Sequence, residues 1–199
     1  MTSRAEWLTV GGPVEPWRDL GLVVDDDGLV ALFGTGIRIA EGDPPGLVGW
    51  ALSGTEGADI DGLRTEAVVP LSPILVEHPL GAIGLDHVVI VTDELERTSR
   101  AIGEATGAPL KRVREVDEMR QGFHRLGSLV VELVERAGLP AGSAEFWGLV
   151  LNVEDLDVAV ELLGPERIGP AKTAVQPGRS IATLRPEAAL GLPVALMTP

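Results

Sequence analysis

The sequence predicts an α+β protein built from repeated βαβββ modules with mixed β-sheets. One observation is the stretch from Leu85 to Gly107, where an apolar run, a polar turn and an amphipathic segment follow one another. A second is that three further strand-like segments follow this unit, which gives the order βαβββ. A third is that the order restarts downstream: Val-Thr-Asp-Glu-Leu at 91–95 superposes on Asn-Val-Glu-Asp-Leu at 152–156, an offset of 61 residues.

The first module begins with a predicted strand over Leu85–Val91. Asp93 is predicted to cap the following helix, with Glu96 three residues later as in a capping box, and Gly107 fits the helix exit. Leu95, Thr98, Ile102 and Ala105 recur at helical spacing between them. The remaining strands are predicted at Leu110–Val116, Gly122–Leu126 and Leu129–Glu135.

The second module repeats this order with different residues. Trp147–Val153 is predicted as a strand, and Asp155–Leu163 as a helix that Gly164 and Pro165 terminate. Its remaining strands are predicted at Ile168–Pro170, Ser180–Leu184 and Pro193–Met197.

The N-terminal part has shorter elements of the same kinds. One short helix is predicted at Glu15–Gly21, one helical turn at Asp59–Leu63, and Glu77–Gly81, which includes His78, reads as a linker. We therefore expect an abbreviated domain over 1–79 and a main domain over 80–199 with modules at 84–136 and 145–199. The short strands are predicted at Trp7–Val10, Leu22–Val24, Leu29–Phe33, Gly36–Ala40, Leu47–Leu52, Ala67–Val69 and Ile74–Val76.

The composition narrows the functional class. With 199 residues, of which 45% are hydrophobic, the chain can bury a core, and no apolar run reaches the ~20 residues of a membrane span. The absence of cysteine excludes thiolate ligands and thiol nucleophiles. The net charge of −14 opposes binding to nucleic acid or to an anionic membrane. An acidic cytoplasmic protein is the simplest interpretation.

The paired modules resemble the vicinal oxygen chelate superfamily, which includes glyoxalase I, bleomycin-resistance proteins and extradiol dioxygenases. The resemblance depends on Leu85–Val91, on Asp93–Glu96 and on Leu129–Leu133, covers 84–199 well, and extends to 5–76 only in outline. It implies two modules that pair edge to edge, with curled sheets around an open cup.

The resemblance also implies metal-ligand positions, one in the first strand and one in the fourth strand of each module. His87 and Glu132 occupy these positions in the first module, so they are the candidate ligands of a divalent metal ion. Gly148 and Ala195 stand at the corresponding positions of the second module and supply no ligand. The sequence therefore departs from the family pattern at two of four positions.

The residues themselves single out the same pair. Glu132 lies in the apolar strand Leu-Val-Val-Glu-Leu-Val, where a buried carboxylate needs a partner or a shifted pKa. A divalent metal would serve, and so would an ion pair with His87 or Arg125. Alternatively, Glu132 faces water from an edge strand and His87 is a hydrogen-bonded core residue.

Four further residues are candidates for substrate binding. Phe123 and Arg125 share one face of a strand, where Phe123 suits the core and Arg125 suits either an anionic ligand or a surface ion pair. Trp147 precedes the vacant position Gly148 and suits a cup wall or the core. Arg179 follows a turn and suits either the pocket mouth or a solvated hairpin.

Three functional hypotheses follow. The first is a lyase or dioxygenase in which His87 and Glu132 bind a metal or act as acid and base. The second is a metal-free protein that sequesters a small molecule, as bleomycin-resistance proteins do. The third is a structural or interaction module without a small ligand. The exposed sheet edges are compatible with a homodimer.

Overall fold

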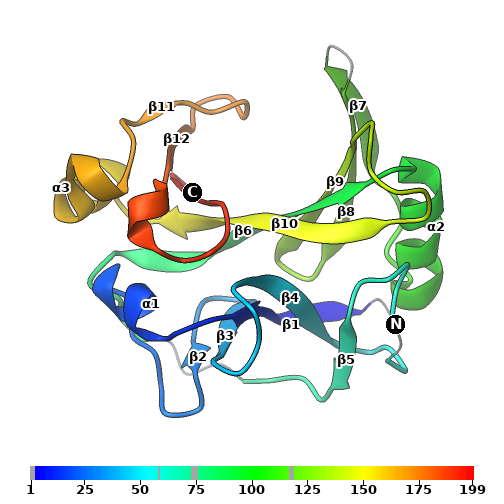
Figure 1. Cartoon of the computed structure of the whole chain (residues 1–199), viewed down its shortest axis with the longest axis horizontal. Helices are drawn as coiled ribbons and strands as arrows, with labels where there is room; N and C mark the ends of the chain where they lie inside the picture. Colours follow the sequence, from blue (N-terminus) through cyan, green and yellow to red (C-terminus); the bar gives the residue numbers. More distant parts are fainter. Residues whose placement is uncertain (1–2, 58, 73–75, 117–118) are drawn as a thin grey trace.

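The computed structural model describes residues 3–57, 59–72, 76–116 and 119–199. Figure 1 shows a large curled β-sheet lying over a smaller sheet, with helices α2 (Leu95–Thr106) and α3 (Leu156–Arg167) at opposite ends of the large sheet. The predicted α+β class, with paired βαβββ modules around an open cup, is confirmed. The cup opens on the side of the large sheet away from the small one.

The large sheet has eight strands in the order β11-β12-β13-β10-β6-β9-β8-β7. The central pair β6 and β10 is antiparallel, and each of these strands has a parallel partner on its outer side, β9 and β13 respectively. The strands are β6 (Ala82–Thr92), β7 (Arg112–Val116), β8 (Met119–Leu126), β9 (Leu129–Glu135), β10 (Ala144–Val153), β11 (Lys172–Thr173), β12 (Ser180–Thr183) and β13 (Val194–Met197).

The strand register agrees with the repeat of 61 residues. His87 lies opposite Val150, and Val89 lies opposite Gly148, so each partner is the 61-residue equivalent of the other pair's β6 residue. Val89 also pairs with Glu132 on β9, just as Val150 pairs with Ala195 on β13. Gly148 and Ala195 therefore occupy the positions in the second module that His87 and Glu132 occupy in the first.

The small sheet has five strands in the order β2-β3-β1-β4-β5. Its central pair β1 and β4 is antiparallel, and β3 and β5 run parallel to them on either side, as in the large sheet. The elements are β1 (Arg4–Gly11), α1 (Glu15–Asp19), β2 (Leu29–Val30), β3 (Gly36–Ala40), β4 (Gly46–Ser53) and β5 (Thr65–Val68).

Some predicted elements are wrong. Residues 22–24 are not a strand, and 59–63 form a turn closed by the Ile60–Leu63 bridge instead of a helical turn. Residues 168–170 contribute only the isolated bridge between Ile168 and Leu184. Of the predicted strand Ile74–Val76, residues 74 and 75 lie outside the described residues and Val76 is not in a strand. Short apolar runs carry little information about strand pairing, which tertiary partners decide.

The start of α2 also differs from the prediction. Its N-cap is Glu94, without a side-chain cap, and the Leu95 N–H donates to the Glu135 carboxylate at 3.0 Å. Asp93 instead accepts from Gly142 N–H at 2.8 Å and binds Arg97. A carboxylate from β9 therefore serves the helix terminus that a local capping box was expected to serve. The predicted exit at Gly107 is confirmed by its left-handed conformation.

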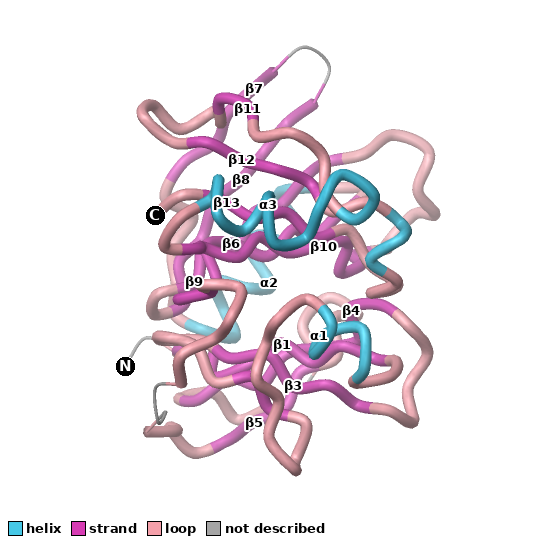
Figure 2. Tube along the Cα trace, turned by 90° about the vertical axis from the view of Figure 1, so that its left-hand side faces the viewer, coloured by secondary structure: helices cyan, strands magenta, loops and turns pink. Residues whose placement is uncertain are grey.

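The two sheets share one hydrophobic core. Leu8 and Trp50 of the small sheet and Val88 and Leu151 of the large sheet are all fully buried in it. Trp50 meets Phe146 of β10 edge to face, with ring centroids 5.2 Å apart. Figure 2 shows the small sheet stacked on the large one in a second view. The core therefore fixes the convex side of the large sheet and leaves its concave side open.

The predicted linker is part of this packing. His78 is buried, its Nδ1 accepts from Val23 N–H at 3.0 Å, and its Nε2 lies 2.9 Å from the Ala31 carbonyl oxygen. The segment is thus fastened to the small sheet, although its sequence suggested a solvated connection. The domain boundary at residue 79 stays a prediction. No helix in the described ranges is long and apolar enough to span a membrane.

Candidate functional site

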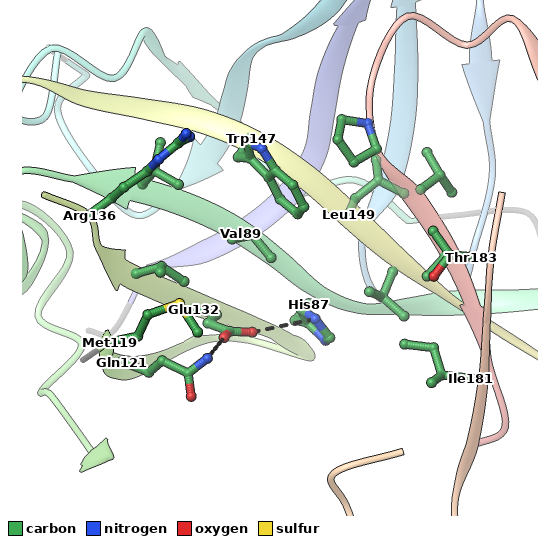
Figure 3. A pocket seen from close by; sticks show the side chains of 16 residues that line it. His87, Val89, Met119, Gln121, Glu132, Arg136, Trp147, Leu149, Ile181 and Thr183 are labelled. Carbon is green, nitrogen blue, oxygen red and sulfur yellow. Dashed lines mark hydrogen bonds and ion pairs between the residues drawn. The ribbon is translucent and has the colours of Figure 1, made fainter. Parts of the chain in front are cut away.

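The concave face of the large sheet holds a cavity of about 650 Å³. Both modules contribute to it, and its surface is mainly apolar, with polar groups from β6, β8 and β9 (Figure 3). Such a volume suits a small-molecule ligand. The lining residues are His87, Val89, Val91, Met119, Gln121, Glu132, Val134, Arg136, Trp147, Leu149, Val150, Ile181, Thr183, Pro193, Val194 and Ala195.

Two β-bulges shape the polar and aromatic parts of the cavity. Opposite β10, the register jumps from His87 to Leu85, so Asp86 is an additional residue on β6. The register also jumps from Phe146 to Gly148, which makes Trp147 an additional residue on β10. A bulge changes the direction of side chains along a strand. It lets the adjacent Asp86 and His87 contact each other, and Trp147 lines the cavity with 48% of its surface exposed.

Glu132 lies at the centre of a short polar chain. Its Oε2 is 3.5 Å from His87 Nε2, and its Oε1 accepts from the Gln121 side-chain amide at 2.8 Å (Figure 3). The cross-strand registers bring the three residues together, because Val89 separates His87 from the row that contains Glu132 by one alternation. The predicted pair His87 and Glu132 therefore does meet, and Gln121 joins it.

The environment of Glu132 changes its acidity. Burial raises the pKa of the Glu132 carboxyl, and the positive charges of His87 and Arg114 only partly offset this effect. A carboxyl group with a raised pKa is more readily protonated near neutral pH than an exposed one. It can then donate as well as accept a hydrogen bond.

Asp86 orients His87 from the other side. The Asp86 Oδ2 and His87 Nδ1 atoms are 2.7 Å apart, and Asp86 Oδ1 is 2.8 Å from Arg179. Burial alone would raise the pKa of Asp86, but the hydrogen bonds from His87 and Arg179 outweigh burial and lower it. Asp86 is therefore a fixed anion that favours a proton on Nδ1 and leaves Nε2 directed toward Glu132.

Arg179 is held by two further acceptors. It donates to the Thr198 carbonyl oxygen and to the Asn152 side chain, each at 2.7 Å. Its side chain is mostly buried, so it is not the solvated hairpin residue considered from the sequence. Arg179 connects β12 to the polar chain through Asp86, and its role in binding a substrate directly stays a prediction.

The other predicted substrate-binding residues lie at different places on the cup. Phe123 lies on β8 directly opposite Glu132 and on the same face, partly exposed and below the Arg112 guanidinium. Arg125 is exposed and donates to the Gly127 carbonyl oxygen at 3.2 Å. Neither lines the cavity itself, whereas Trp147 does. Their roles in binding stay predictions.

The donor set bears on the metal expected from the resemblance. Across the cup from His87 and Glu132 lie Val150 and Ala195, which carry no donor atoms. The Asp86 oxygens are engaged by His87 and Arg179. No group of three or more His, Cys, Asp or Glu side chains suited to a metal ion occurs within the described ranges. The described residues therefore do not fit a metal ion held by three or more protein ligands.

Sequence reasoning missed several residues of the site. Gln121 could have been found, because period-two alternation places it on the same face as Phe123. Met119 and Arg136 lie at the ends of the strands that carry Gln121 and Glu132, and they also line the cavity. Asp86 had no such signal, since simple alternation directs it away from His87 and only the bulge brings the two together.

Comparison with solved structures is informative about the fold. Methylmalonyl-CoA epimerase from Mycobacterium tuberculosis is similar with a TM-score of 0.51 and 20% identity, over 63% of this chain and 93% of that chain. The fold is glyoxalase-like. The expected resemblance to the vicinal oxygen chelate superfamily is thereby confirmed for the fold. At this identity the similarity shows the fold alone.

Other glyoxalase-like neighbours are more distant. A Streptomyces coelicolor methylmalonyl-CoA epimerase in complex with 2-nitronate-propionyl-CoA has a TM-score of 0.48 and 16% identity, over 59% of this chain and 94% of that chain. A hypothetical protein from Bacillus halodurans has a TM-score of 0.47 and 14% identity, over 58% and 93%. No protein-family model and no curated protein sequence matches this chain.

Proposed function

We propose that this glyoxalase-like protein binds a small, largely apolar molecule in the cup, with the polar group of that molecule facing Glu132, His87 and Gln121. One observation carries the proposal: Trp147 and Met119, each 48% exposed, border an apolar cavity whose few polar groups are grouped around a buried carboxylate. Leaving such large side chains uncovered is unfavourable in water. A ligand that covers them would recover part of that free energy.

The polar chain supports a defined binding mode. Glu132 and Gln121 are held by each other, and His87 is held by Asp86, so these groups are oriented before a ligand arrives. Preorganised polar groups lose little entropy on binding. They would select ligands with a carbonyl or hydroxyl group at the matching position.

Ligand screening by thermal shift, followed by titration of tryptophan fluorescence, tests the proposal. Trp7, Trp17 and Trp50 are buried, so Trp147 is the tryptophan that a cup ligand would quench. We expect ligands that raise Tm to quench this fluorescence, and Val150→Trp, which fills the cup, to abolish both effects. Val158→Trp, on the exposed face of α3, is the matched control and should bind normally. Ligands that bind Val150→Trp unchanged would contradict the proposal.

A second candidate function is proton transfer to or from the bound molecule. The chain from Asp86 through His87 to Glu132 favours it, because a carboxyl with a raised pKa suits general acid–base catalysis. In this scheme Glu132 exchanges a proton with the ligand, while Asp86 holds the His87 ring. The metal-dependent alternative remains a further test, because metal titration of the wild type and of Glu132→Ala measures it directly.

Exchange of carbon-bound protons into D2O tests the acid–base scheme. A panel of small carbonyl compounds that bind the cup is incubated with wild type and Glu132→Gln, and exchange is followed by NMR. We expect the wild type to catalyse exchange and Glu132→Gln to lose roughly 100-fold or more of the rate. Binding without catalysed exchange would leave a binding protein only.

A further inference from the structure

The cup is polarised in charge along the rows of the sheet. One row crosses four strands through Arg112, Phe123, Glu132 and Val89, which all share the concave face. The next row contains Arg114, Gln121, Val134 and Val91. Arginine therefore stands at the β7 end of both rows, on the wall that the first module contributes.

Two more arginines belong to the same wall. Arg125 pairs with Val130 in the row that contains His87, and Arg136 follows β9 and lines the cavity beside Trp147 (Figure 3). The salt bridges of the described residues include none of these four arginines. By contrast, Arg120 on the opposite face of β8 binds Glu96 and Glu135.

The lack of partners is informative because the protein is strongly acidic. The chain has 30 acidic and 16 basic residues, so a basic side chain usually finds a carboxylate nearby. Four arginines on one concave wall have no such partner among the described residues. Selection of these positions by solubility alone is a poor explanation, because an acidic protein gains no solubility from isolated cations.

The opposite wall of the cup is apolar. Val150, Ala195 and Ile181 pack together on the concave face of the second module. The nearest charged pair on that side, Asp86 and Arg179, is internally neutralised. A ligand that spans the cup therefore meets cations at one end and hydrocarbon at the other.

We propose that the ligand of the cup is an amphipathic anion, with a carboxylate or phosphate group near Arg114 and Arg136 and an apolar body extending past Trp147 toward Val150 and Ala195. The inference rests on the proposed binding function and specifies its ligand class. Guanidinium groups bind carboxylate and phosphate through paired hydrogen bonds. Glu132 opposes an anion close to it, so the anionic group lies nearer to the arginines than to His87.

Matched probes that differ only in the head group test this proposal. Octanoate, octyl phosphate and octanol are titrated by calorimetry and by tryptophan fluorescence. We expect at least one anionic probe to bind roughly tenfold or more tightly than octanol, as one charge-assisted hydrogen bond provides. Raising NaCl from about 50 mM to about 500 mM should weaken the anion and spare octanol.

Arginine variants locate the anionic group. Arg114→Gln and Arg136→Gln should each weaken the preferred anion about tenfold and leave octanol binding unchanged. Arg100→Gln is the matched control, because Arg100 is exposed on α2, away from the cup. Comparison of octanoate with octyl phosphate distinguishes the two head groups.

The outcomes separate the two proposals. Equal affinity for octanol and both anions, or unchanged anion affinity in both cup variants, would overturn the anionic ligand and leave the binding function intact. If no probe quenched Trp147 or bound by calorimetry, both the amphipathic ligand and the proposed cup would be contradicted for ligands of this size. A loss of anion binding in Arg100→Gln equal to that in Arg114→Gln would assign the effect to net charge and overturn the site.

Discussion

Asp86 shows how one residue determines the geometry of the cup. On a regular strand it would face away from His87, but the bulge brings its carboxylate to 2.7 Å from the ring. Arg179 then neutralises the carboxylate from β12. The orientation of His87 toward Glu132 consequently depends on contacts from two different modules.

The substitution Asp86→Asn should destabilise the fold at neutral pH. The variant loses charge-assisted hydrogen bonds to Arg179 and His87, and we expect the free energy of unfolding to fall by about 1–3 kcal/mol at pH 7. The pKa of Asp86 is lowered, so its contribution is present above the ordinary value of 3.8 and is lost as pH falls toward the folded-state pKa.

Urea denaturation of both proteins at pH 7 and below pH 3.8 measures the effect. The difference between wild type and Asp86→Asn should narrow in acid. Asp26→Asn, in an exposed turn, is the control and should behave as wild type at both values. A difference that stayed constant with pH would show that the carboxylate charge is not responsible.

Glu132→Gln should have the opposite pH dependence. Burial raises the pKa of Glu132, so the folded protein binds this proton more tightly than the unfolded chain does. Wild-type stability therefore declines as pH rises from the ordinary value of 4.5 through the folded-state pKa. Glutamine remains neutral, so the variant should gain stability relative to wild type between about pH 4 and about pH 7.

Thermal unfolding across this range provides the measurement. Glu104→Gln, an exposed change of the same type on α2, should show no such trend. A relative gain that was greatest in acid would contradict the raised pKa.

Strand β10 illustrates how an element loses a ligand position while keeping its place in the sheet. Gly148 is equivalent to His87, but a Cβ atom there would lie 2.6 Å from the Pro193 carbonyl oxygen. The chain before β13 thus passes directly over the position. Any side chain at 148 would displace this segment, so the second module contributes a wall instead of a ligand.

Two glycine-to-alanine substitutions should have opposite signs. Gly148→Ala forces the Pro193 backbone to move and should cost about 1–3 kcal/mol of stability. Gly103→Ala lies inside α2, where the nearest atom to the new Cβ is 3.6 Å away, and should stabilise by about 0.5–1 kcal/mol. Chemical denaturation measures both, and a neutral Gly148→Ala would show that Pro193 yields easily.

At the scale of the whole molecule, the small sheet supports the cup from below. Trp50 is fully buried, donates from its indole N–H to Thr65 at 2.7 Å, and meets Phe146 of the large sheet. The shared core covers the convex face of β6 and β10. The concave face can remain open because the other face is fully packed.

Substitution of Trp50 should therefore destabilise both sheets together. We expect Trp50→Ala to lower the free energy of unfolding by about 3–5 kcal/mol, and Trp50→Phe to have a smaller effect in the same direction. Hydrogen exchange should show protection falling in parallel in β1 and β9. Val158→Ala on α3 is the exposed control. Loss of protection in β1 alone would show that the sheets are independent.

The sequence by itself determined the βαβββ order, the offset of 61 residues and the candidate pair of His87 and Glu132. These features depend on local periodicity, on turn residues such as Gly107 and Gly164, and on a charged residue within an apolar strand. Each leaves a signal within a few residues, so each can be predicted without knowledge of distant contacts.

Only the tertiary structure decided which side chains complete the site. Asp86 and Trp147 depend on bulges, the α2 terminus depends on Glu135 of β9, and Arg179 reaches Asp86 across two modules. The burial of His78 and the shared core also depend on long-range packing. The physical reason is that strand register and bulge position are set by partner strands, and local sequence carries little information about either.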